Sequence, residues 1–171
     1  MIRLTGAALV IFSASLAGFG LARSVRTVCA QLEGLIWALD FMKSEMSARL
    51  TPLPQLFSML GACREKSVAA FFTEAGRALS APPGCTVPVS FKRGAQNASA
   101  LCVPGECMQS LYALSMSLGR FELESQLAAI ERAKAEMTAA LLRLQAEKRA
   151  RCRSYETIGV CAGLALAVIL V

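Results

Sequence analysis

Residues 25–49, VRTVCAQLEGLIWALDFMKSEMSAR, decide the fold class that the sequence predicts. Apolar residues recur there at alternating steps of three and four, which is the spacing of one face of an α-helix. The members of this seam are Val25, Val28, Leu32, Leu35, Leu39, Met42 and Met46. Because proline cannot sit inside a helix, Thr51-Pro52-Leu53-Pro54 is a break. We therefore predict one helix that continues as far as Arg49.

This helix is predicted to continue upstream into an apolar run. Leu4 to Ala22 carries no charge and would span roughly 28 Å as a helix, enough for a hydrocarbon core. A cleaved signal peptide is the alternative, but Arg23 and Arg26 follow the run on the wrong side for export. We expect an uncleaved transmembrane anchor over residues 1–22.

A second uncharged run ends the chain, from Ile158 to Val171. It covers only about 21 Å as a helix, so an interfacial helix or a dip into one leaflet is the alternative to a full span. Lys148 to Arg153, at its entrance, is strongly basic. Both runs thus carry their positive flank toward the middle of the chain. This predicts a C-terminal membrane segment over residues 157–171 and a cytoplasmic domain over residues 23–156.

Gly159 and Gly163 in the second run form a Gly-x-x-x-Gly pair. Small residues on one stripe of a helix let another helix approach closely, and this close packing holds helices together in lipid. The pair predicts a membrane helix-packing site, although the motif is short and common.

The middle of the chain is predicted to be helical throughout. Short amphipathic helices are expected at Leu53 to Leu60, Val68 to Leu79, Val87 to Asn97 and Met108 to Leu118. After Gly119 a seam resumes with Leu123, Leu127, Ile130, Met137, Leu141 and Leu144, interrupted by Lys134.

The expected fold is all-α. The first and last helices pair antiparallel as the long stem of one bundle, four short helices pack at the far end, and membrane segments flank the whole. The predicted stem core consists of Leu32, Leu35, Leu39, Leu127, Ile130 and Leu141.

Composition argues against an enzyme, a metal protein and a nucleic-acid binder. The chain has 171 residues, 55% apolar, a net charge of +6, seven cysteines and no histidine. Without histidine or close cysteine pairs a zinc site is not expected, and no cofactor is predicted. Cys102 and Cys107 have no partner base, and the acidic residues after Gly119 fit an exposed helix face. The basic charge lacks interleaved aromatic residues, so we expect a membrane rather than nucleic acid nearby.

Three blocks of sequence together carry a resemblance to a known family. They are Ile2-Arg3-Leu4-Thr5-Gly6 with Gly18-Phe19, then Gln31-Leu32 through Glu45-Met46 to Thr51-Pro52-Leu53-Pro54, and last Leu118-Gly119, Glu124, Gln126, Gly159-Val160 and Gly163 through Ile169-Leu170. With these blocks the chain resembles stage III sporulation protein AB of endospore-forming bacteria.

The resemblance implies a place in the channel complex that joins the mother cell to the engulfed forespore. The family's helical domain is similar to the cytoplasmic domain of the platform protein of type II secretion machines. A secretion-type ATPase of the same operon and other membrane subunits of the channel are the implied partners. The implied location is the mother-cell membrane at the forespore boundary. A membrane-anchored assembly or signalling factor with no ATPase partner is the alternative.

Overall fold

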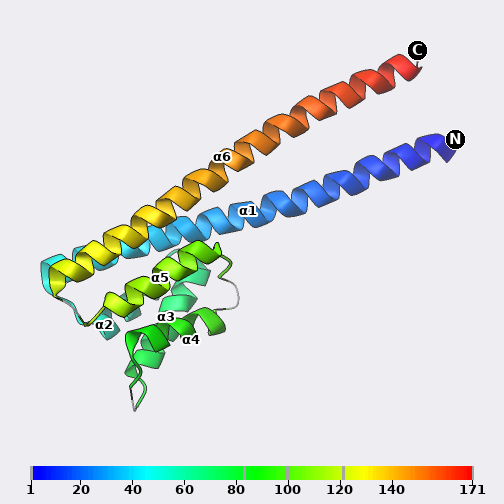
Figure 1. The fold of residues 1–171 in the computed structure, drawn as a ribbon. Helices are drawn as coiled ribbons and strands as arrows, with labels where there is room; N and C mark the ends of the chain where they lie inside the picture. Colours follow the sequence, from blue (N-terminus) through cyan, green and yellow to red (C-terminus); the bar gives the residue numbers. More distant parts are fainter. Residues whose placement is uncertain (1, 83, 99–100, 121, 171) are drawn as a thin grey trace. The chain divides into compact units, whose positions relative to one another are not determined.

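The computed structural model follows the backbone of residues 2–170 except 83, 99–100 and 121, and describes the side chains of residues 25–147 with the same gaps. Its elements are α1 (Ile2–Arg49), α2 (Leu53–Leu60), α3 (Lys66–Ser80), α4 (Val87–Asn97), α5 (Gly105–Ser117) and α6 (Leu123–Leu170) (Figure 1). The described backbone contains helices and no strand, which confirms the predicted all-α class.

The chain divides into two compact units. One comprises residues 1–26 and 142–171, and therefore the beginning of α1 and the end of α6. The other comprises residues 27–141, which hold the rest of both long helices together with α2 to α5. This second unit, called the bundle below, contains the core described here.

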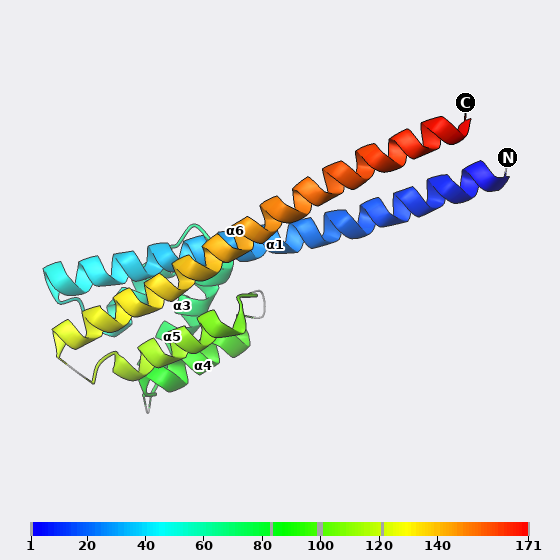
Figure 2. The same ribbon diagram turned by 45° about the horizontal axis from the view of Figure 1, so that its top comes forward.

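Within the bundle, α1 and α6 lie side by side and antiparallel. Lys43 on α1 binds Glu131 on α6, with Nζ and Oε1 2.5 Å apart. One turn earlier on α1, Asp40 binds Lys134, which is one turn later on α6, again at 2.5 Å. From the first ion pair to the second, the residue number falls on α1 and rises on α6. The two helices therefore run in opposite directions. Figure 2 shows the two helices next to each other here, as Figure 1 does.

Buried side chains line the facing sides of these two helices. On α6 the buried row steps by three and four residues, as the predicted helical seam requires. The buried apolar residues are Leu32, Leu35, Ala38, Leu39, Met42 and Met46 on α1, and Ile130, Ala133, Met137 and Ala140 on α6.

The end of α1 follows from the local sequence. Thr51 precedes Pro52 and is therefore confined to extended backbone, so the helix must stop before it. Leu50 takes the left-handed conformation, with φ of +51°, and its side chain is 71% exposed. The Thr51 hydroxyl donates to Glu45 Oε2 at 3.2 Å, which ties the turn back to the last turns of α1.

Three of the four short helices, α2, α3 and α4, share an aromatic core. Phe57 of α2, Phe71 and Phe72 of α3 and Phe91 of α4 are almost fully buried. Their ring centroids lie 5.0–6.3 Å apart in tilted and edge-on arrangements, which suit the aromatic quadrupole. Because α3 contacts both α2 and α4, and α4 contacts α5, this cluster is the centre of the short-helix layer.

Gly94 lets α4 approach α3 closely. A Cβ atom at this position would lie 2.8 Å from the Phe71 carbonyl oxygen, which belongs to the backbone and cannot move aside cheaply. Gly94→Ala is therefore expected to lower the free energy of unfolding by about 1–3 kcal/mol. Gly105→Ala, in a helical position with no atom within 4 Å, is the matched control and should leave it unchanged or slightly raised. Equal melting temperatures for both variants would contradict the close contact.

Candidate interaction site

The structure places the predicted stem residues at two levels of burial. Leu32, Leu35, Leu39 and Ile130 have no exposed surface, whereas Leu127 and Leu141 are half-buried. On α6, the alanines at positions 133 and 140 are buried more deeply than these two leucines. The polar break at Lys134 has a cause, since this side chain lies at the edge of the stem and binds Asp40.

The ion pairs at this edge shift the titration of their members. The hydrogen bond from Lys43 lowers the pKa of Glu131, and the bond to Asp40 raises the pKa of Lys134. The Glu131 contribution to stability is thus present above the ordinary glutamate pKa and lost as pH falls below it. The Lys134 contribution is present below the ordinary lysine pKa and lost in strong alkali. All four side chains are partly exposed, so each pair adds little stability.

Gln31 joins three parts of the bundle through its buried amide. Its Nε2 donates to Ser67 Oγ at 3.2 Å at the beginning of α3, and its Oε1 accepts from the Cys102 backbone N–H at 2.8 Å. Beside it, Gly34 lies so close to α3 that an added Cβ would be 2.8 Å from Glu65 Cβ. In the sequence, the available signal for this junction was Gln31, a polar residue next to the apolar seam of α1. The prediction rested on the spacing of apolar residues and therefore did not include it.

Gln31→Leu is expected to destabilise the bundle. It keeps the approximate shape but leaves the Cys102 N–H and the Ser67 hydroxyl without this partner, and an unmade buried hydrogen bond costs about 1–3 kcal/mol. At roughly 2–4 °C per kcal/mol, the melting temperature should fall by several degrees. Gln96→Leu changes an exposed glutamine on α4 in the same way and should melt like the parent chain. A Gln31→Leu variant that melts like this control would show that the junction contributes nothing.

The residues considered for chemistry do not gather into one site. Glu122 and Glu124 are exposed, and Glu136 accepts a hydrogen bond from Ser110. Cys102 is exposed and Cys107 is buried. Among the side chains that the structure describes, no three His, Cys, Asp or Glu residues lie close enough to hold a metal ion.

The described surface also offers a shallow groove between α2 and α3. Its one charged lining residue, Arg77, is bound to Glu74 at 2.5 Å. That bond and one from Asn97 lower the pKa of Glu74. The residues that line the groove are Pro54, Ser58, Thr73, Gly76, Arg77 and Ser80.

Exposed apolar side chains are what sequence reasoning missed. Trp37, the only tryptophan of the chain, is 50% exposed on α1 and stacks on Phe41 with ring centroids 5.5 Å apart. Tyr112 and Met116 are similarly exposed one turn apart on α5. In the sequence, the available signal for these exposed side chains was the presence of large apolar residues outside the predicted seams. Such exposed side chains are typical of a protein that presents surfaces to partners.

The predictions for the two ends of the chain concern residues whose side chains the structure does not describe. Gly159 and Gly163 are within α6, and residues 4–22 and 158–170 of the apolar runs belong to α1 and α6. Within the part of the chain that the structure describes, no helix is long and apolar enough to cross a membrane.

Comparison with known proteins decides the family. The sequence model of stage III sporulation protein AB matches residues 3–171, nearly the whole chain. The chain belongs to this family. A solved structure of a stage III sporulation protein AB has the same fold, with a TM-score of 0.66 and 16% sequence identity over 72% of this chain and 98% of that one. No curated protein matches the sequence. Membership in the stage III sporulation protein AB family makes the chain a sporulation protein.

Proposed function

We propose that the chain is a non-enzymatic membrane subunit of the channel complex between mother cell and forespore. Its bundle acts as a platform for a cytoplasmic secretion-type ATPase. The observation that carries the proposal is the family match over residues 3–171, which includes both apolar ends as well as the bundle. The bundle is held together by a buried amide and by ion pairs, and it has aromatic side chains on its surface. These features suit a protein that binds partners better than they suit an enzyme.

Membrane attachment at both ends is part of this proposal. Residues 1–22 and 157–171 supply the anchors, and residues 23–156 form the cytoplasmic domain at the mother-cell membrane facing the forespore. The support is in the sequence, because Arg23 and Arg26 follow the first apolar run and Lys148 to Arg153 precede the second.

Co-purification from sporulating cells tests the platform role. The full chain, tagged and solubilised from membranes, should bring down the ATPase encoded in the same operon together with other membrane subunits of the complex. The untagged chain is the control for background binding. Recovery of the membrane subunits without the ATPase, under conditions in which the ATPase is present in the lysate, would replace the platform role by that of an assembly or signalling factor.

A further inference from the structure

Helices α4 and α5 form an antiparallel hairpin. Only residues 98–104 connect them, and the two helices contact each other. A Cβ atom on Gly119, just beyond α5, would lie 3.9 Å from Val87 Cγ2 at the beginning of α4. The beginning of α4 is therefore next to the end of α5, which brings Val89 and Met116 to the same end of the hairpin.

Three large apolar side chains of this hairpin are exposed to solvent. Inward residues such as Phe91, Leu111 and Leu114 are at most 3% exposed. In contrast, Val89 on α4 is 44% exposed, and on α5 Tyr112 is 49% and Met116 43% exposed. A single exposed apolar side chain is ordinary, whereas three on two contacting helices offer apolar area to a partner. Tyrosine, methionine and arginine are also the residues enriched where proteins meet.

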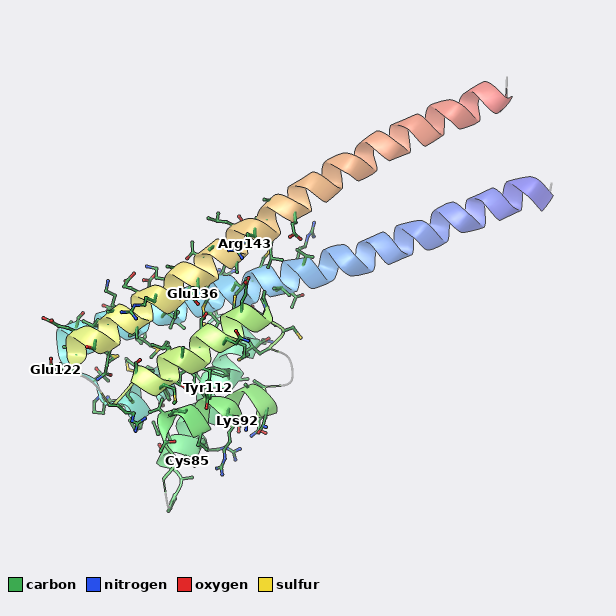
Figure 3. All side chains as sticks on the ribbon, in the orientation of Figure 1. Cys85, Lys92, Tyr112, Glu122, Glu136 and Arg143 are labelled. Carbon is green, nitrogen blue, oxygen red and sulfur yellow. The ribbon has the colours of Figure 1, made fainter. Side chains whose placement is uncertain are left out.

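Two cations accompany these apolar side chains. Lys92 and Arg93 are exposed on α4, which has no acidic residue. Other cations of the bundle have acidic partners, as Lys43 has Glu131 and Lys134 has Asp40. Lys92 and Arg93 make no ion pair with any described side chain. Figure 3 shows Lys92 and Tyr112, which carry labels, on neighbouring helices of this layer.

We propose that Val89, Lys92, Arg93, Tyr112 and Met116 form a docking surface, the α4–α5 surface, for an acidic protein segment that carries apolar side chains. Two adjacent uncompensated cations select negative charge, and the flanking Tyr112 and Met116 provide the apolar area that holds the complex together. Anionic lipid is a poorer fit, since its recognition uses clusters of about 4–8 basic residues and this surface has two. The inference rests on the proposed function only in taking the partner from the same complex.

A photo-crosslinking amino acid at position 112 of the full chain, in sporulating cells, tests the surface. It should cross-link to a protein of the complex through a segment rich in Asp and Glu. Lys92→Glu with Arg93→Glu places like charges together, so the cross-link yield should fall at least about tenfold. Arg64→Glu with Arg132→Glu reverses two other exposed cations, neither of which belongs to α4 or α5, and should leave the yield unchanged. Reversing acids in the partner segment to lysine should restore the cross-link to the Lys92→Glu, Arg93→Glu chain.

Three results would overturn the α4–α5 surface: a cross-link to lipid alone, no cross-link to a protein, or the same yield from both charge-reversed pairs. Thermal melting of the purified chain verifies that the reversed variant folds, and Lys92→Gln with Arg93→Gln replaces it if it does not. If the complex still co-purifies with the chain while the cross-link fails these criteria, the surface is wrong and the proposed function stands. If no subunit co-purifies with the parent chain, the proposed function itself fails.

Discussion

Replacing Leu35 and Leu39 together with alanine is expected to unfold the bundle at physiological temperature. Both side chains are fully buried on α1. Truncation of a buried leucine typically costs about 2–5 kcal/mol, because apolar contacts are lost and a cavity remains. A domain of this size has only about 5–15 kcal/mol of stability in total, so two truncations consume most of it.

The measurement is thermal melting of the full chain in detergent, followed by helical circular dichroism. Leu142→Ala is the matched control, since Leu142 is 60% exposed on α6 and its truncation removes the same atoms. We expect the control to melt like the parent chain and the double variant to melt far lower or not to fold. An unchanged melting temperature for the double variant would mean that this side of α1 is not part of the core.

Gly159→Leu with Gly163→Leu is expected to abolish sporulation while the protein still accumulates in the membrane. The two glycines lie one turn apart on α6. If residues 157–171 enter the membrane as proposed, another helix can approach this stripe closely. Leucine at both positions would hold the helices apart and prevent assembly, and the bundle, which does not contain these residues, would still fold.

Heat-resistant spore counts measure this effect, with immunodetection of the chain in membranes. Ala165→Leu is the control, because position 165 lies on the other side of the helix from Gly163 and gains a side chain of the same size. Normal spore counts from the glycine double variant would show that both glycines are merely tolerated in lipid. Equal loss in the Ala165→Leu variant would point to the segment as a whole rather than to the stripe.

Most of the helices could be predicted because strong local signals bound them. Proline at positions 52 and 54 ends α1 and begins α2, and α4 has the bounds Val87–Asn97 that the sequence predicted. Two beginnings were wrong. α3 begins at Lys66 rather than Val68, and α5 begins at Gly105 rather than Met108. α3 begins with Lys66 and Ser67, and α5 begins with Gly105 and Glu106. None of these four residues is part of an apolar pattern, so periodicity does not mark these two beginnings.

The surface and the junctions could not be predicted in the same way. A buried glutamine such as Gln31 depends on partners 36 and 71 residues away, which no local pattern encodes. The pairing of Lys134 with Asp40 depends on the register of α6 against α1, which is set by tertiary packing. Exposure of Tyr112 depends on which side of α5 the neighbouring helices cover, and this too is decided only when they assemble.

The side of the membrane on which the bundle lies is the most direct test of the platform proposal. Cys102 is an exposed thiol of the bundle and can report it. A membrane-impermeant maleimide, applied to intact protoplasts of sporulating cells, should leave Cys102 unmodified until the cells are lysed. Lysis then supplies the positive control, and a Cys102→Ser chain identifies the labelled site. Modification of Cys102 before lysis would place the bundle outside the cytoplasm, where it could not meet a cytoplasmic ATPase.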